Sequence, residues 1–236
     1  CRQWGLSSAE YQDNENFPRQ VYVREGRRME GMYFFTANDA VAVSEGQRPP
    51  VHKTSIASSH YALDSHACFK REAGRVHLDG FFGYESVPYT IPLGVMVPKE
   101  VGNLLFPVPV SGSHVGFSTM RMEPCWMALG QAAGIAAANA VKSGLPVQKL
   151  DVGEIQDRLV ENGASLIWFR DVHVFSPDFK IVQKLGLAGC IPGWEARLDD
   201  DASMSEKNEF RRLSGINIPE ELKTRREILT YIYERL

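Results

Sequence analysis

The chain has 236 residues, of which 44% are hydrophobic and 23% are charged, as expected for a globular protein with one large domain or slightly more. The net charge of −3 comes with no basic stripe, which argues against nucleic acid as a partner. Its four cysteines (Cys1, Cys68, Cys125 and Cys190) share no metal-ligand spacing, so we expect no metal site and no disulfide scaffold.

The first half of the chain is predicted to be rich in β-structure. Residues 18–35 alternate in polarity and turn at Glu25-Gly26, which is typical of an antiparallel hairpin. Thr36 is a candidate N-cap for a short turn that follows. Residues 55–71 alternate small polar and apolar side chains, and residues 74–83 predict another strand.

The segment at residues 87–110 contains five prolines. Because proline cannot donate a ladder hydrogen bond, we expect extended, edge-like chain here. Within it, residues 103–110 are the best candidate for a buried strand. The polar loop that follows carries hydroxyl groups, flexible backbone and one imidazole: Ser111, Gly112, Ser113, His114, Ser118 and Thr119.

A long helix is predicted from about Glu123 to Ser143. Pro124 suits its first turn, because the missing N–H would have had no helical partner. Gly144 suits its C-cap. The run at residues 126–141 is too short and too rich in alanine to span a bilayer, so we expect no membrane span. Further helices are predicted within residues 152–163, 175–189 (with Ser176 as cap), 199–215 and 219–236.

The long helix has an unusually smooth face, formed by Gly130, Ala133, Gly134 and Ala137. Each interior glycine costs about 1 kcal/mol relative to alanine, so we expect close packing of this face on a sheet or a ligand. The helix N-terminus carries partial positive charge and suits an anion or an electron-rich carbonyl. Structural packing is the alternative interpretation, because the chain contains neither G-x-G-x-x-G nor a P-loop.

Several segments together resemble a known family: YVREGRRMEGMY (22–33), SIASSHYALDSHAC (55–68) and RMEPCWMALGQAAG (121–134). They are similar to bacterial FAD-dependent oxidoreductases, whose members are often labelled xanthan lyases, over residues 17–187. The resemblance implies that the chain is the C-terminal half of such a protein. The N-terminal half, which would hold the ADP part of FAD, is then a missing partner segment, and the absent leader and initiator methionine are consistent with this.

The fold class implied by the resemblance is α/β for the whole protein and α+β for this chain. Residues 1–98 would belong to a β-rich substrate domain that is inserted into a Rossmann-type FAD domain. Residues 99–150 would return to the FAD domain. Residues 151–236 form a helical tail that weakly resembles a surface-layer homology module.

The resemblance also implies FAD as cofactor, with the N-terminus of the long helix directed at the pyrimidine edge of the flavin. The residues placed at the cofactor would be Ser111, Gly112, Ser113, His114, Arg121, Met122, Glu123 and Pro124. Arg121 has an alternative, purely structural role, in which it pairs with Glu123 or a backbone carbonyl. Cys125 begins the helix, where a thiol pKa can fall, although a buried packing cysteine is the other interpretation.

Catalytic candidates lie at even spacing in residues 60–66. If this segment is one strand, His60, Asp64 and His66 share a face and can accept a proton beside the flavin. A polar network within the sheet is the alternative. Arg24 and Arg27 are candidates to bind a substrate carboxylate or sugar acid, although hairpin arginines are often simply exposed.

The expected function is hydride transfer between FAD and a small organic or carbohydrate-derived substrate. Two alternatives stay open. One is a polysaccharide lyase acting on uronate-containing glycans, with His66 as base and Arg27 as carboxylate partner. The other is a non-catalytic fragment whose tail mediates assembly. Because a flavin domain without its first βαβ unit would expose apolar surface, we also expect either a companion segment or a homo-oligomer.

Overall fold

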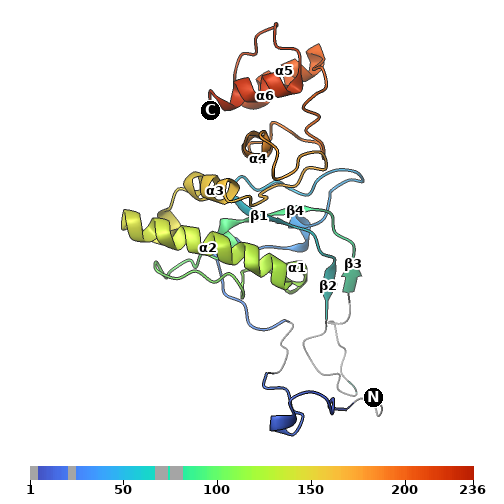
Figure 1. Ribbon diagram of the computed structural model, residues 1–236, viewed down its shortest axis with the longest axis vertical. Coiled ribbons are helices and arrows are strands. Elements are labelled where there is room, and N and C mark those ends of the chain that lie inside the picture. Colours follow the sequence, from blue (N-terminus) through green and yellow to red (C-terminus); the bar gives the residue numbers. More distant parts are fainter. Residues whose placement is uncertain (1–4, 21–24, 67–73, 75–81) are drawn as a thin grey trace.

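A computed structural model describes residues 5–20, 25–66, 74 and 82–236 (Figure 1). Arg24, Cys1, Cys68 and most of the strand predicted at residues 74–83 lie outside the described residues. In Figure 1 the first described residues lie at one end of the long axis, and the C-terminal helices lie at the other.

The described strands form two small antiparallel sheets. Strand β1 (Ser55–Ser59) pairs with β4 (Tyr89–Pro92), and β2 (Leu63–Ser65) pairs with β3 (Phe82–Tyr84). All four residues of β4 are buried, and β1 is buried at its first three residues. The β1–β4 pair is therefore the centre of the core, whereas β3 lies at the surface.

Six α-helices are described: α1 (His114–Met120), α2 (Glu123–Ser143), α3 (Val152–Glu161), α4 (Phe179–Leu187), α5 (Met204–Ser214) and α6 (Arg225–Tyr233). Short 3-10 turns occur at Gln12–Asn14, Ala37–Asp39, Leu93–Val95 and Val147–Lys149. Helix α2 packs on β1 and on α3, α1 packs on β2, and α4 contacts both α3 and α6 (Figure 1). This mixture of helices and small antiparallel sheets is the α+β arrangement that we predicted for this chain. None of the helices in the described part of the chain combines the length and the apolar character that a bilayer crossing needs.

The structure confirms the helix predictions. Their sequence signals are local, so they do not depend on distant parts of the chain. Helix α2 begins at Glu123, carries proline in its first turn and ends before Gly144, whose φ of 67° is left-handed. Thr36 caps the turn Ala37–Asp39 in a reciprocal capping box with Asp39. The cap of α4 differs from the prediction. Asp178 is its N-cap, and Ser176 Oγ instead accepts a hydrogen bond from Asp178 N at 3.3 Å.

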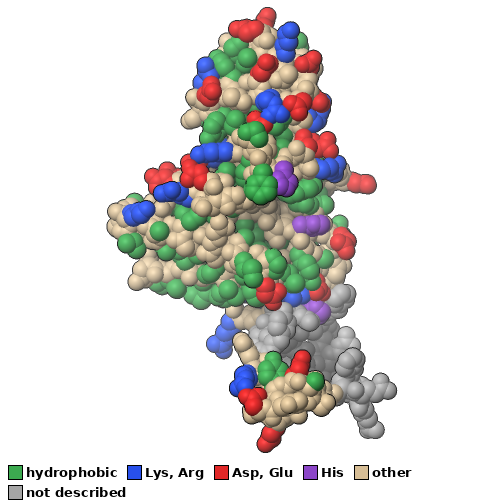
Figure 2. Space-filling view, viewed as in Figure 1, with side chains coloured by type: hydrophobic (Ala, Val, Ile, Leu, Met, Phe, Trp, Pro, Cys, Tyr) green, Lys and Arg blue, Asp and Glu red, His purple; other side chains and the backbone are tan. Residues whose placement is uncertain are grey.

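The smooth face of α2 does not pack as predicted. The buried residues of α2 are Cys125, Leu129, Ala132 and Ala136, whose spacing places them on a single face toward the core. An added Cβ at Gly130 or Gly134 would meet no atom within 4 Å. Met127 is 73% exposed and Val141 is 84% exposed on this glycine face. Figure 2 shows charged side chains of both signs gathered over the C-terminal helices and few over α2. The described part of this chain therefore leaves the glycine face uncovered.

Two strand predictions are wrong. The described part of residues 18–35 contains no strand, and its extended chain bonds to a distant segment, with Met32 N on Val97 O at 2.8 Å and Tyr33 N on Gly94 O at 3.0 Å. The alternating pattern indicated extended chain correctly but assigned the wrong partner. Residues 103–110 also form no strand. Pro107 and Pro109 have no N–H to donate to a neighbouring strand, so this segment stays irregular and joins no sheet.

Candidate functional site

A cluster of five ionisable side chains gathers where β2, α1 and the start of α2 meet. Asp64 lies on β2 and His66 follows its end. His114 is the first residue of α1, and Arg121 is the residue between α1 and α2. Glu25 comes from the extended chain near the N-terminus. We call these five residues the Arg121 cluster.

Arg121 is the buried centre of the cluster, with a side chain that is only 4% exposed. Its Nη2 lies 2.6 Å from Asp64 Oδ2 and also donates to the Asp64 carbonyl at 3.2 Å. Its Nε lies 3.7 Å from Oε1 of Glu25, which is 5% exposed. That second contact is an ion pair without a hydrogen bond. The Arg121 guanidinium therefore lies against two carboxylates, those of Asp64 and Glu25. Its positive charge offsets the unfavourable free energy of removing these carboxylates from water.

Each carboxylate also holds an imidazole. His66 Nε2 lies 2.9 Å from Asp64 Oδ1, and His114 Nε2 lies 2.9 Å from Glu25 Oε2. His114 Nε2 is also 2.7 Å from the carbonyl oxygen of His66. Because both of these described neighbours of His114 Nε2 are acceptors, this nitrogen carries the hydrogen. Two carboxylate–imidazole pairs joined through a guanidinium have the groups that proton transfer requires.

The cluster unites residues that the sequence assigned to two separate sites. Asp64 and His66 were predicted as catalytic groups, whereas His114 and Arg121 were predicted at the cofactor. The structural alternative for Arg121 was a pair with Glu123 or a backbone carbonyl. Arg121 does donate to a carbonyl, that of Asp64, but its carboxylate partners are Asp64 and Glu25 and not Glu123.

His60 is not part of the cluster. Strand β1 ends at Ser59 and β2 begins at Leu63, so the expected single strand face over residues 60–66 does not form. His60 lies in the break, where its Nε2 is 3.1 Å from the carbonyl oxygen of Ser86. The prediction that His60, Asp64 and His66 share one face is therefore wrong, because the chain changes sheets between them.

The predicted substrate arginines do not enter the Arg121 cluster. Arg27 is exposed and makes none of the cluster's contacts, and Arg24 lies outside the described residues. The neighbouring Arg28 has a structural role. Its Nε donates to the Gly112 carbonyl at 3.1 Å, and its guanidinium lies 5.3 Å from the ring centre of Phe117.

The predicted cofactor loop packs closely on Phe35. A Cβ at Gly112 would lie 2.9 Å from the Phe35 carbonyl oxygen, so glycine is required for this approach. Ser113 N donates to the same carbonyl at 2.8 Å, and Ser113 Oγ caps α1 by accepting from Gly116 N at 2.9 Å. Ser111 is fully buried, and its Oγ has no hydrogen-bond partner among the described residues. Gly112 and Ser113 therefore already have structural roles.

The N-terminus of α2 is open, in contrast to the packed loop before it. The side chain of its N-cap, Met122, accepts from Arg121 Nη1 at 3.9 Å but makes no hydrogen bond to the helix N–H groups. Glu123 and Pro124 are exposed. Behind this end, burial raises the pKa of the Cys125 thiol to about 12, although a hydrogen bond with Ser59 opposes that rise. Cys125 is thus a packing cysteine and not a reactive thiol. Within the described ranges, no group of three or more His, Cys, Asp or Glu side chains is arranged to hold a metal ion.

Glu25 is the member of the cluster that the sequence did not indicate. Beside Gly26 it looked like the first residue of an exposed hairpin turn. No local signal marks a buried acid at this position, because the cation that neutralises it comes from a segment almost 100 residues later.

Comparison with known proteins gives one family. The family model described as FAD dependent oxidoreductase matches residues 3–159, which include the whole Arg121 cluster and all of α2. No curated protein and no solved structure matches the chain. The chain belongs to the FAD-dependent oxidoreductase family, and the cofactor of that family is FAD.

Proposed function

We propose that this chain supports hydride transfer between FAD and a small organic or carbohydrate-derived substrate, and that the Arg121 cluster is the proton-handling part of that site. The observation that carries the proposal is the position of the cluster. The two carboxylate–imidazole pairs converge on Arg121, which directly precedes the open N-terminus of α2.

The residues at this end of α2 fit a flavin edge. Met122, Glu123 and Pro124 would lie at its pyrimidine side, where the uncapped helix end presents partial positive charge and the N–H groups of its first turn, Pro124 itself having none. His114, at the start of α1, and Ser111, whose Oγ has no hydrogen-bond partner among the described residues, come from the segment that precedes this end. FAD, when bound, supplies the hydride acceptor or donor of the reaction.

The chain's own residues would handle the proton that accompanies the hydride. In this proposal the His66–Asp64 pair accepts a proton from the substrate, and Asp64 Oδ1 fixes the orientation of the imidazole through His66 Nε2. Arg121 acts as a positioning residue, because it holds Asp64 and Glu25 in place from a buried position. His114 carries its hydrogen on Nε2 between Glu25 and the His66 carbonyl, and so links the two pairs.

The ADP end of FAD needs phosphate-binding backbone that a glycine fingerprint normally provides, and this sequence contains no such fingerprint. We therefore propose that a companion segment or a second copy of the chain completes the cofactor site.

The proposal is tested on the purified gene product that contains this chain. Wild-type protein should carry FAD and show the absorbance band of oxidised flavin. His66→Gln should retain the bound FAD but slow reduction of the flavin by substrate, because the substrate proton then has no acceptor. Arg121→Met should lower the flavin reduction potential, because a nearby positive charge favours the reduced form. Colourless protein that takes up no added FAD would refute the proposal, as would an unchanged rate of flavin reduction by substrate in His66→Gln.

A further inference from the structure

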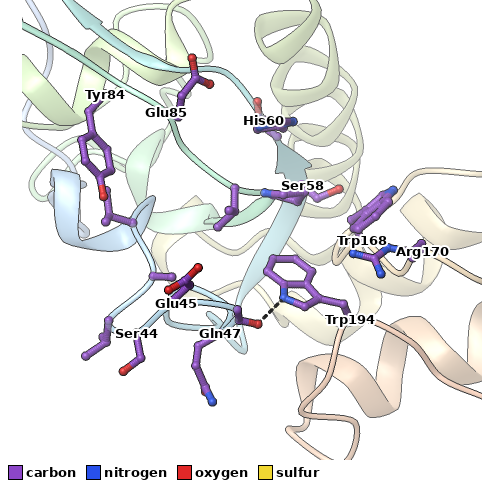
Figure 3. Close-up of a pocket in the computed structure, with 17 residues that line it drawn as sticks. Ser44, Glu45, Gln47, Ser58, His60, Tyr84, Glu85, Trp168, Arg170 and Trp194 are labelled. Carbon is purple, nitrogen blue, oxygen red and sulfur yellow. Dashed lines mark hydrogen bonds between the residues drawn. The ribbon is translucent and has the colours of Figure 1, made fainter.

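A large open cleft lies apart from the Arg121 cluster, with a volume of about 930 Å³. Three parts of the chain form its walls: the loop at residues 41–47, the ends of β1 and β3, and Trp168, Arg170 and Trp194 (Figure 3). The last three residues lie beyond the segment matched by the family model, which ends at residue 159. The cleft therefore joins the family domain to the C-terminal part of the chain.

One wall of the cleft is formed by two tryptophans, Trp168 and Trp194, whose positions are set by contacts within the protein. The ring centroids of Trp168 and Trp194 are 6.0 Å apart at an interplanar angle of 58°. Trp194 Nε1 donates to the Gly46 carbonyl at 2.8 Å, as Figure 3 shows. Arg48 Nη2 donates to the Trp168 carbonyl at 2.6 Å, and the Arg48 guanidinium lies 4.3 Å from the Trp194 ring centre. Trp168 nevertheless remains 38% exposed.

The remaining walls carry polar groups that both accept and donate hydrogen bonds. Glu45 and Glu85 are exposed, and neither has an ion-pair partner among the described residues. Gln47, Ser58 and His60 also line the cleft, and Figure 3 shows the labelled polar side chains distributed around its rim. Carboxylates accept hydrogen bonds only, whereas the amide, hydroxyl and imidazole groups do both.

We propose that this cleft binds a neutral saccharide, with one sugar ring stacked on Trp168 and its hydroxyl groups bonded to Glu45, Glu85 and His60. A sugar ring has an apolar C–H face that suits an exposed indole and a rim of hydroxyls that both donate and accept. The binding site is independent of the proposed flavin chemistry, because none of its residues belongs to the Arg121 cluster.

An organic cation is the other ligand that aromatic rings and carboxylates together can bind. Charges at the tryptophan wall argue against it. Arg48 already lies over the Trp194 ring, and Arg170 lines the same wall. A ligand cation stacked there would meet like charge, whereas a neutral sugar would not.

The test uses the purified gene product that contains this chain, including its C-terminal part, on an array of neutral oligosaccharides of glucose, galactose, mannose and xylose. Binding of at least one neutral glycan is expected. For that glycan, Trp168→Ala should weaken the affinity at least tenfold, and Trp168→Phe should restore part of it. Phe175→Ala is the matched control, because Phe175 is an aromatic of the same region, is 88% exposed and does not line the cleft. It should leave affinity unchanged.

Three outcomes would overturn the inference: no neutral glycan bound by the wild type, equal affinity in Trp168→Ala and Phe175→Ala, or stronger binding of benzyltrimethylammonium than of any sugar. Circular dichroism establishes that the variants fold. If Trp168→Ala does not, Glu45→Gln at an exposed loop position provides the same comparison and should weaken glycan affinity. FAD content is measured in parallel and should be equal in all variants, so that failure of glycan binding is distinguishable from failure of the flavin proposal.

Discussion

Arg121→Met is the substitution that most directly probes the buried cluster. Methionine has similar length and no charge, so it removes the cation and leaves a flexible apolar side chain in nearly the same volume. Glu25, 5% exposed, and Asp64, 26% exposed, then remain close together without Arg121. We expect this variant to be much less stable than a surface arginine variant.

The magnitude follows from the two contacts. With an effective dielectric constant of about 20, Coulomb attraction amounts to about 6 kcal/mol for the Asp64 contact at 2.6 Å and about 4 kcal/mol for the Glu25 contact at 3.7 Å. Desolvation of the three charges cancels much of this attraction in the intact cluster. Removal of one partner from a buried pair costs about 3–5 kcal/mol, because the remaining carboxylate stays buried.

Urea denaturation at neutral pH measures the free energy of unfolding of Arg121→Met and of the double variant with Glu25→Gln. The single variant should lose about 3–5 kcal/mol, and the double variant should recover about 1–2 kcal/mol, since a neutral amide is less costly to bury. Arg212→Met is the control, because its partner Glu209 is half exposed and the pair should contribute less than about 1 kcal/mol. A loss below about 1 kcal/mol in Arg121→Met, or no recovery in the double variant, would refute the argument.

Three further predictions concern other parts of the fold. Gly134→Ala should raise the free energy of unfolding by about 1 kcal/mol in urea denaturation, because an added Cβ meets no atom within 4 Å; a loss would mean that another surface covers the glycine face. Burial alone would raise the pKa of Asp39, but the nearby His52 imidazole and hydrogen bonds from Tyr33 and Thr36 lower it to about 2. The stability that Asp39 contributes is therefore present above about pH 4 and is lost as pH falls toward 2. The shift corresponds to about 2.5 kcal/mol, reduced to about 1–2 kcal/mol by partial solvent screening, and acid titration of Asp39→Asn should lack this loss. Cys125 should react with a disulfide reagent at pH 8 only at the rate of unfolding, because burial raises the pKa of its thiol to about 12; rapid labelling of Cys125 in the folded protein would contradict this.

Local signals in the sequence determined the helices of this protein. Proline in the first turn and glycine after the last turn set the bounds of α2, and the capping box of Thr36 and Asp39 set the short turn before β1. These features depend on side chains and backbone groups within one turn of each other, so no distant partner is needed to form them. The motif at residues 121–134 likewise indicated the family, which the match over residues 3–159 confirms.

Only the tertiary structure decided which surfaces and charges meet. Alternation in residues 18–35 indicated extended chain, but its hydrogen-bond partner is the segment at residues 94–97, because pairing depends on which strand is available in space. The small residues of α2 likewise did not show which face is buried; the core takes Leu129 and Ala136 and leaves Gly134 in solvent. Glu25 pairs with Arg121, almost 100 residues later in the chain. A buried charge needs a partner of opposite charge, but that partner can come from any segment of the fold, so the sequence does not identify it.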